Sequence, residues 1–591
     1  MNKSCAFIVS VACALGIMAF AGVAGAVTTE GISPTSPGGP DYTLAEMATE
    51  FENVHDAGGG AYTADTTGGA SRVRFNSGTT LDMASGESLD LGSSIYWIQD
   101  GTLTMDNASI TGATSWRTYS DAEGTIEMSN GASITVDTYF TMNRLMDEVV
   151  MDGASITANG GKVLASITCK AGSTNSVTST SGTCTNGGQI VMEDNSTLNV
   201  LGEDFGYYHN NNVDVVMAPG STITVEQPYF SRGWKYLTGG GTEANPATIN
   251  GGSQMLFWGN ESGGEYEGNV DVTGPTNVST TGNMYCGHIP MSWKGGQFEA
   301  GQVRVGFTGL GVDDESTYWE GCDFGTKYAT VSFSQNDHEM VDCTFNEVWV
   351  QFDTWHGQDN RAAMATLTNC NYTPGEDGAY DPDTNPDSRD HGGRAMILAE
   401  GGASVGDYGM QSREYVGVTV EDQLGNPVPG ATVEVTAISA NGVVWNGSQV
   451  TDANGETPAG TDGIMVQDWT LYFEDGETIP GDVGVGSWYS RTSTGSPWED
   501  GFEYLVTVSY PGEDDQTDTI TCLSGTDDAW KTADIWDFTF VFDLPTDIPG
   551  DTDGDGDVDI NDLSTLAANW DQCGKTWADG DFTGDGCVDI N

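Results

Sequence analysis

The chain has 591 residues, of which 86 are Asp or Glu and only 19 are Lys or Arg, so its formal net charge is −67. A surface this acidic repels phosphate backbones and anionic lipid, which excludes a nucleic-acid binder and a polybasic membrane binder. Glycine accounts for 81 residues, about twice the average usage of ~7%, and aromatic residues make up 10%. Such a composition predicts a mainly β protein with short strands and tight turns.

The N-terminus has the pattern of a signal peptide over residues 1–26. Lys3 precedes an apolar run at residues 6–20, and Ala24-Gly25-Ala26 forms a small-residue cleavage site. The run is shorter than the ~20 residues that a membrane-spanning helix needs, which favours cleavage over a membrane anchor. We therefore expect a secreted, extracellular or cell-surface protein without a transmembrane segment.

A repeat with a short period occupies residues 60–405. A small residue, then Ser or Thr, then an apolar residue recur so that the apolar positions are 89, 110, 134, 156, 198 and 223, with differences of 21, 24, 22, 42 and 25. A second version places aromatic residues at 298, 324, 345 and 372, with differences of 26, 21 and 27. A fixed period this short indicates a solenoid, and each period has room for one coil of two or three short strands. We predict that positions 110, 134 and 156 stack on one face, as do positions 324 and 345.

Residues 27–59 are expected to hold a linker and a helix that caps the open end of the solenoid. Thr43-Leu44-Ala45-Glu46 is a capping box, and an amphipathic stretch follows it to about Val54. In pattern, residues 60–405 resemble the right-handed parallel β-helix proteins of the pectin-lyase type and the coiled repeats of bacterial surface adhesins. That resemblance implies a right-handed parallel β-helix.

The cysteines fall into two groups. Cys169 and Cys184 bracket a Ser/Thr-rich loop that would lie within the double interval of 42 residues, and Cys573 and Cys587 form another candidate pair. Cys322, Cys343 and Cys370 recur with the aromatic version of the repeat. They are predicted to form an inward ladder of buried thiols rather than disulfides.

The repeat stops before residues 413–545. In this region apolar and polar residues alternate, as in β-strands, between sequences typical of hairpin turns. The string VTVEDQLGNPVPGATVEVT resembles the carboxypeptidase-regulatory-like and bacterial Ig-like β-sandwich modules. That resemblance implies an antiparallel β-sandwich that acts as a spacer or adhesion unit. Six tryptophans could bind sugars here, although such residues are more often core or turn anchors: Trp445, Trp469, Trp488, Trp498, Trp530 and Trp536.

The most specific motif lies in residues 548–591. A calcium loop of the EF-hand type needs oxygen ligands at positions 1, 3, 5, 7, 9 and 12 and Gly at position 6. Gly556 occupies position 6 of a first loop, in which the ligand positions are filled by Asp551, Asp553, Asp555, Asp557, Asp559 and Asp562. Six carboxylates in 12 residues repel one another unless a dication is present, so the spacing favours a Ca²⁺ site over an acidic linker.

A second, shorter loop follows, with candidate ligands Asp581, Thr583, Asp585 and Asp589. The sequence reaches only position 11 of this loop, so we expect the first loop to bind Ca²⁺ more strongly. The two loops resemble a type I dockerin with a truncated second repeat, which implies a small α-helical segment and a cohesin-like protein partner. Loop positions 10 and 11, which help to recognise cohesin in that family, are the apolar/amide pairs Ile560-Asn561 and Ile590-Asn591.

Two function classes remain open. One is a non-catalytic surface, adhesion or scaffold-assembled protein associated with polysaccharide, and the other is a polysaccharide lyase or glycoside hydrolase tethered by the dockerin-like segment. Asp313-Asp314-Glu315 is acidic but lacks a matching basic motif. Arg304, Lys327 and the histidines at 288, 338 and 356 are scattered along the repeat. The sequence therefore favours the non-catalytic class and leaves catalytic residues unassigned.

Overall fold

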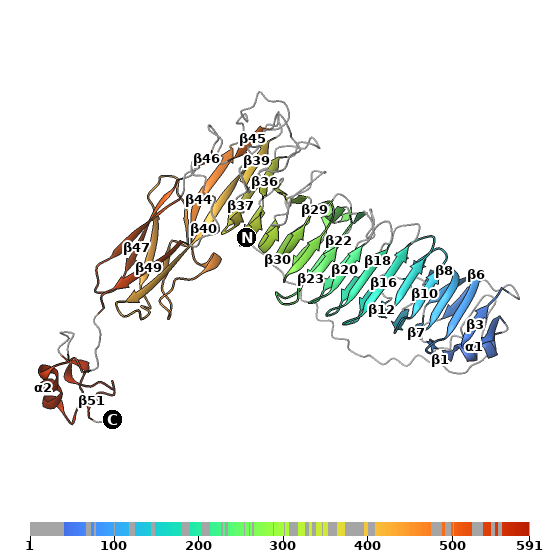
Figure 1. The fold of residues 1–591 in the computed structure, drawn as a ribbon, viewed down its shortest axis with the longest axis horizontal. Helices are drawn as coiled ribbons and strands as arrows, with labels where there is room; N and C mark the ends of the chain where they lie inside the picture. Colours follow the sequence, from blue (N-terminus) through green and yellow to red (C-terminus); the bar gives the residue numbers. More distant parts are fainter. Residues whose placement is uncertain are drawn as a thin grey trace. The chain divides into compact units, whose positions relative to one another are not determined.

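A computed structural model represents the fold of the chain (Figure 1). It describes residues 41–589 except for 52, 67–71, 76–78, 100, 118–123, 143–147, 180–188, 202–212, 226–228, 231–233, 253, 259, 263–264, 288, 301, 306–316, 325–329, 334–337, 346, 353–362, 373–394, 400–407, 474–486, 491–497, 500, 523–535, 545–549 and 553–557. The protein is mainly β, with a β-solenoid and few helices. The chain divides into two compact units, residues 1–301 and 302–591.

The first unit is built from coils whose strands stack in parallel, as Figure 1 shows from β3 to β30. One sheet contains β1 (Asp41–Thr43), β5 (Thr80–Met83), β7 (Thr102–Asp106), β9 (Thr125–Ser129), β12 (Glu148–Asp152), β15 (Ser166–Cys169), β17 (Gln189–Met192), β19 (Val213–Met217), β22 (Trp234–Gly239), β27 (Asn269–Val272) and the start of β30 (Met291–Glu299). The other long sheet contains β3 (Ala61–Ala64), β6 (Ser88–Gln99), β8 (Ser109–Arg117), β10 (Ser133–Val136), β13 (Ser155–Ala158), β16 (Thr174–Ser179), β18 (Thr197–Leu201), β20 (Thr222–Val225), β23 (Ala247–Asn250), β28 (Thr276–Ser279) and the end of β30.

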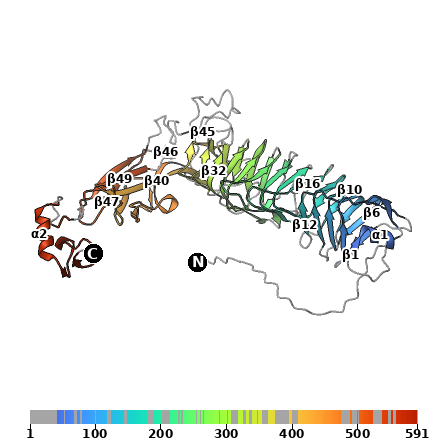
Figure 2. The ribbon, with the colours of Figure 1, turned by 60° about the horizontal axis from the view of Figure 1, so that its bottom comes forward.

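Two shorter sheets complete coils of this unit. The first pairs β4 (Arg72–Phe75), the ends of β6 and β8, β11 (Phe140–Thr141) and β14 (Val163–Leu164). The second pairs β21 (Tyr229–Phe230), β24 (Gln254–Trp258) and β29 (Asn283–Gly287). Figure 2 shows the same stack of coils from a second direction.

The register confirms the predicted stacking of the repeat. Ile134 pairs with Ile110 on one side and with Ile156 on the other, and all three side chains are fully buried. Strand residues alternate between the two faces of a sheet, so the Ser and Thr residues beside each Ile face outward while the Ile residues fill the core. The apolar positions that recur in the sequence are therefore the core positions of the solenoid.

The predicted Cys169–Cys184 disulfide is wrong, and the loop expected between these cysteines contains a strand, although the interval of 42 does hold two periods. Residues 174–179 form β16, a full rung between β13 and β18, and Val177 pairs with Ile156. Cys169 is a buried thiol outside any disulfide, because it ends β15 with its side chain in the core; Cys184 lies outside the described residues. On the next rung, β18, Leu198 pairs with Asn175. The buried Asn175 Oδ1 accepts the N–H groups of Gly153 and Ala154.

A helix precedes the first coils. α1 (Leu44–Glu50) begins at the predicted capping box, in which Thr43 Oγ1 accepts the Glu46 N–H and the Glu46 carboxylate accepts the Thr43 N–H. Leu44, Met47 and Phe51 are buried, and the helix packs against β1, β2 (Val54–Gly58) and β5. It ends four residues earlier than expected, since Val54 already starts β2.

In the second unit the aromatic version of the repeat also forms stacked coils. Phe324 pairs with Phe345, and Phe345 pairs with Tyr372, as predicted for positions 324 and 345. One sheet contains β32 (Thr317–Phe324), β34 (His338–Val341), β37 (Ala363–Thr368) and β40 (Tyr408–Asp422), with β35 (Thr344–Phe345) and β38 (Asn371–Tyr372) beside the end of β32. The other contains β31 (Gln302–Val305), β33 (Thr330–Phe333), β36 (Glu347–Phe352), β39 (Ala395–Ala399) and the antiparallel β45 (Ser487–Ser490).

The predicted thiol ladder is present in these coils. Cys322, Cys343 and Cys370 are buried and precede the paired residues 323, 344 and 371 on successive rungs. The Cys343 thiol donates to the Val341 carbonyl at 3.3 Å, and the Cys370 thiol donates to the Thr368 carbonyl at 3.4 Å. These cysteines therefore act as small core residues.

β40 belongs both to the coils and to the sheets that follow them. Its residues 408–413 pair in parallel with β37, and its residues 416–422 pair in parallel with β49 (Trp536–Phe542). β44 (Ile464–Phe473) pairs with β40 in the antiparallel sense and also meets β42 (Val444–Trp445) and β46 (Trp498–Glu499).

A separate four-stranded sheet lies near these strands, in the order β43 (Ser448–Val450), β41 (Thr432–Ala437), β47 (Glu503–Ser509) and β48 (Gln516–Thr521). Buried residues of β40, β41, β44, β47, β48 and β49 form one hydrophobic cluster, which includes Val418, Val433, Val466, Val506 and Phe540. Trp469 is buried, and the Arg413 guanidinium lies 4.1 Å from the centre of the Trp445 ring, which favours core and anchor roles for these two tryptophans.

Candidate calcium-binding segment

The end of the first predicted loop is held by Asp562. Its Oδ1 accepts the Thr552 N–H at 2.5 Å and the Thr552 hydroxyl at 3.1 Å, while its Oδ2 accepts the Asp559 N–H at 2.7 Å. Asp562 is only 1% exposed. The residue at loop position 12 therefore joins loop position 2 to loop position 9, which closes the loop on itself.

The helix after this loop starts at a strong N-terminal cap. α2 (Ile560–Asn569) has Asp559 as its cap residue, and the Asp559 carboxylate accepts the Asn561 N–H at 2.7 Å. Asp562 is the third residue of the helix and completes a capping box with Asp559. Carboxylates at a helix N-terminus satisfy free N–H groups and interact favourably with the helix dipole, which explains why the helix begins here.

The second predicted loop is organised around Asp581. This buried carboxylate accepts the Gly586 N–H at 2.7 Å, the Gly584 N–H at 3.0 Å and the Thr583 hydroxyl at 3.2 Å. The Asp585 carboxylate accepts the Cys587 N–H at 2.9 Å. Gly584 and Gly586 both have positive φ, a conformation that L-residues with side chains rarely adopt, so the tight winding of the loop depends on them.

Three predicted ligands of the first loop, Asp553, Asp555 and Asp557, lie outside the described residues. Asp551 is buried at the start of that loop, and Asp589 is exposed near the end of the second loop. Among the residues that the structure does describe, no three acidic, His or Cys side chains converge as metal ligands.

A disulfide and close packing connect the helix to the second loop. Cys573 and Cys587 form the predicted bridge, and they face each other in the short ladder of β50 (Gln572–Cys573) and β51 (Cys587–Val588). Asn569, at the end of α2, donates its side-chain amide to the Asp579 carbonyl at 3.0 Å. A Cβ atom on Gly580 would meet Leu566 at 3.0 Å, so this loop lies directly against the helix.

Several apolar side chains of this segment face solvent. Ile560 is 69% exposed and Leu563 is 56% exposed, and these two residues lie one turn apart on α2. Val558 and Trp570, which flank the helix, are also exposed. An exposed apolar group of this kind is typical of a contact surface.

The solenoid residues singled out for catalysis do not form a described site. His338 is buried in the core, where its Nδ1 lies 2.9 Å from the Thr317 hydroxyl on the neighbouring rung. Residues 288, 313–315, 327 and 356 lie outside the described residues. Arg304 is in β31. His338 is therefore a core residue with a hydrogen-bond partner.

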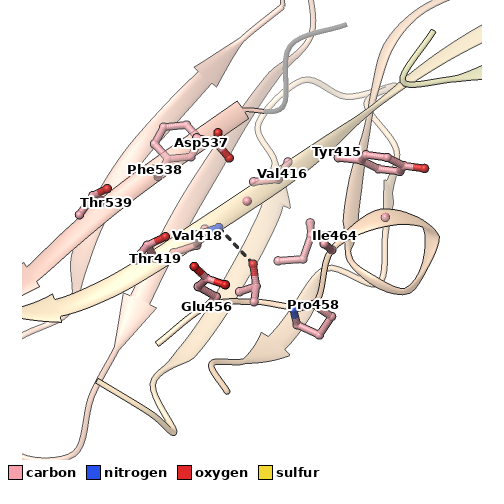
Figure 3. Close-up of a pocket in the computed structure, with 14 residues that line it drawn as sticks. Tyr415, Val416, Val418, Thr419, Glu456, Pro458, Ile464, Asp537, Phe538 and Thr539 are labelled. Atoms are coloured by element: carbon pink, nitrogen blue, oxygen red, sulfur yellow. Dashed lines mark hydrogen bonds between the residues drawn. The ribbon is translucent and has the colours of Figure 1, made fainter. Parts of the chain in front are cut away.

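A pocket that the sequence did not indicate lies beside β40 (Figure 3). It has a volume of about 430 Å³ and is lined by β40, by the start of β49 and by the loop of residues 456–460. Thr457 fixes this loop to β40, because its hydroxyl accepts the Val418 N–H at 3.1 Å. The Glu456 and Asp537 carboxylates and the Thr419 and Thr539 hydroxyls offer oxygen acceptors to a ligand that donates hydrogen bonds.

No family model matches the chain, and neither the curated proteins nor the solved structures compared with it contain a match. Among the described residues, no helix is both long enough and apolar enough to span a membrane.

Proposed function

We propose that the chain is a secreted, calcium-binding, non-catalytic protein of the extracellular space or cell surface. Its C-terminal dockerin-like segment binds Ca²⁺ and attaches the chain to a cohesin-like partner or scaffold, while the solenoid associates with polysaccharide. The observation that carries this proposal is the hydrogen bonding of two loop carboxylates. Asp562 is position 12 of the first calcium-loop pattern, and Asp581 is position 1 of the second.

The hydrogen bonds of these two carboxylates support the calcium proposal. In a calcium loop the residue at position 1 must turn its carboxylate into the loop, and Asp581 does so by accepting N–H groups from positions 4 and 6. The carboxylate at position 12 must return to the start of the loop, and Asp562 does so through Thr552. Both side chains are buried and hydrogen-bonded within their own loops. Bound Ca²⁺ would also neutralise the repulsion among the six loop carboxylates.

The partner proposal rests on α2. Ile560 occupies loop position 10, and it stands with Leu563 on an exposed face of the helix. Burial of these two side chains against a partner would remove apolar surface from water, and Ca²⁺ binding would fix the start of the helix that presents them. The 413–545 region, as an Ig-like β-sandwich, would then serve as a spacer between this segment and the solenoid.

The alternative is a polysaccharide lyase or glycoside hydrolase on the solenoid. It requires a pair of acidic groups, or a basic residue beside carboxylates, on neighbouring coils. Release of reducing ends or unsaturated sugars from acidic and neutral polysaccharides by the full chain would establish this alternative. The absence of release with every polymer tested would favour the non-catalytic proposal.

Calorimetric titration of the full chain with Ca²⁺ tests the proposed function. We expect Ca²⁺ binding with an increase in helical signal. Asp562→Asn should weaken this binding at least tenfold, because position 12 normally supplies a carboxylate ligand. Asp571→Asn is the matched control, since it makes the same charge change just after α2 and outside both loops. Binding that Asp562→Asn leaves unchanged, or no binding by the unsubstituted chain, would overturn the proposal.

A further inference from the structure

The short sheet formed by β4, β6, β8, β11 and β14 has an unusual outer face. Its inner face carries Trp97, Trp116 and Phe140, which stack in the core with ring centres 4.6 and 5.4 Å apart. The outward neighbours of these residues form one column across successive rungs, from β4 to β14. The column contains Arg72, Tyr96, Ser115, Tyr139 and Lys162.

Two aromatic rings stand in this column with a small residue between them. Tyr96 is 40% exposed and Tyr139 is 44% exposed, whereas Ser115 between them is only 1% exposed. Because Tyr96 and Tyr139 are two rungs apart, their backbones are separated by roughly 10 Å along the solenoid. Two exposed aromatic rings on a rigid sheet form a platform on which flat ligand faces can stack.

Three basic residues lie in or beside this column. Arg72 and Lys162 occupy the two ends of the column, and the exposed Arg117 lies two residues after Ser115 on β8. None of the five residues of the column is acidic, although the whole chain has 86 acidic and only 19 basic residues. Asp137 is a nearby acidic residue, two positions before Tyr139 in the chain.

The net charge of −67 does not cancel this local charge. At physiological ionic strength the Debye length is about 8 Å, so distant surface charges are largely screened while charges in contact with a ligand are not. The total charge disfavours densely charged polyanions at long range, and the basic face favours anionic groups at short range. A polysaccharide that carries carboxylate or sulfate groups offers anionic groups to the basic residues and the apolar C–H faces of its sugar rings to the tyrosines.

We propose that this face binds an anionic polysaccharide that runs across the rungs. The sugar rings stack on Tyr96 and Tyr139, and the carboxylate or sulfate groups pair with Arg72, Arg117 and Lys162. This inference deepens the polysaccharide association proposed above and rests on it. It does not depend on the calcium segment, so the two can fail separately.

Affinity electrophoresis of the full chain tests the proposal in gels that contain EDTA. The probes are a soluble uronic-acid polymer, the same polymer after reduction of its carboxyl groups, a sulfated polysaccharide and single-stranded DNA. We expect retardation by the uronic-acid polymer, by the sulfated one or by both. The carboxyl-reduced polymer should retard the chain at least tenfold more weakly than whichever of these two anionic polymers binds. Added salt should weaken the binding, and Arg117→Gln should reduce that salt dependence.

Matched variants assign the binding to this face. The double substitution Tyr96→Ala and Tyr139→Ala should weaken binding at least fivefold, whereas Tyr96→Phe with Tyr139→Phe should retain it, because the stacking rings remain. Tyr236→Ala and Lys294→Gln are controls, since they remove an exposed tyrosine and an exposed lysine that belong to the same unit but not to the column. Equal weakening by the controls, equal binding of the carboxyl-reduced polymer, no binding in EDTA, or tighter binding of DNA would each overturn the proposal.

Discussion

The Asp581 carboxylate accepts the backbone N–H of Gly586 at 2.7 Å, across five residues of the same loop. With the bonds from Gly584 and Thr583, it holds three groups of the loop in one conformation. Asp581→Ala should therefore destabilise the C-terminal segment by about 1–3 kcal/mol even without Ca²⁺, since three hydrogen bonds to the buried Asp581 carboxylate are lost. Denaturant unfolding in EDTA, followed by tryptophan fluorescence, measures this because Trp577 packs on Phe582 beside Asp581.

Asp585→Ala is the control for that measurement. Asp585 lies in the same loop, but its carboxylate accepts an N–H group on a more exposed part of it, from Cys587. A smaller loss of stability is expected. Equal losses from both substitutions would contradict the central role given to Asp581.

The Cys573–Cys587 disulfide closes a stretch with a sequence separation of 14. In the chain-entropy account, a loop of about this length contributes roughly 3 kcal/mol by restricting the unfolded chain. Cys573→Ser with Cys587→Ser should lower the unfolding free energy of the C-terminal segment by about that amount. Reductant should have the same effect on the unsubstituted chain and none on the double variant. A further loss in the reduced double variant would point to another disulfide.

Trp116 lies in the middle of the stacked aromatic core of the first unit and is fully buried. Trp116→Ala should cost about 3–5 kcal/mol, because the substitution leaves a large cavity between Trp97 and Phe140. Tyr139→Ala, which removes an exposed ring from the opposite face of the same sheet, should change the stability by no more than about 0.5 kcal/mol. Chemical denaturation monitored by far-UV circular dichroism compares the two variants, and similar costs would contradict the assigned faces.

Glu193 makes a pH-dependent contribution to the stability of the fold, and the sign of this contribution follows from the direction of its pKa shift. The Lys170 ammonium at 2.8 Å and the Ala171 N–H lower the pKa of the Glu193 carboxyl from its usual 4.5. A lowered folded-state pKa stabilises the fold above pH 4.5, and this contribution disappears as the pH falls through the folded-state value. Because the pair is partly exposed, Glu193→Gln should cost only about 0.2–1 kcal/mol at pH 7. The difference between the two proteins should vanish at pH 2; a difference that persists there would have another origin.

The stacked core could be predicted from sequence because its apolar residues recur at nearly constant spacing. Ile110, Ile134 and Ile156 fill equivalent positions, and the sequence shows them directly. The rung at residues 174–179 was missed because most of its residues are Ser, Thr or Asn, and its buried Asn175 replaces an apolar residue by bonding to the backbone of the previous coil. Polar residues that satisfy buried N–H groups look like turn residues in a sequence.

The candidate site was predictable to a similar extent. The spacing of aspartates indicated Asp562 and Asp581, and the close cysteines indicated the disulfide, because each pattern is local. The basic face was not predictable, since Arg72, Tyr96, Tyr139 and Lys162 are far apart in the sequence. Only the register of the coils brings them into one column.

Two strands of the second unit, β44 and β45, protect the end of its stacked coils from pairing with other chains. A parallel stack must end in a strand whose outer N–H and C=O groups are open to pairing with another chain, which is a route to aggregation. Here β44 pairs with β40 in the antiparallel sense, and β45 does the same for β39, so both sheets end against a strand of opposite direction. Another parallel coil cannot be added at either place. The same strands that continue the fold thus prevent end-to-end growth of the stack at this end.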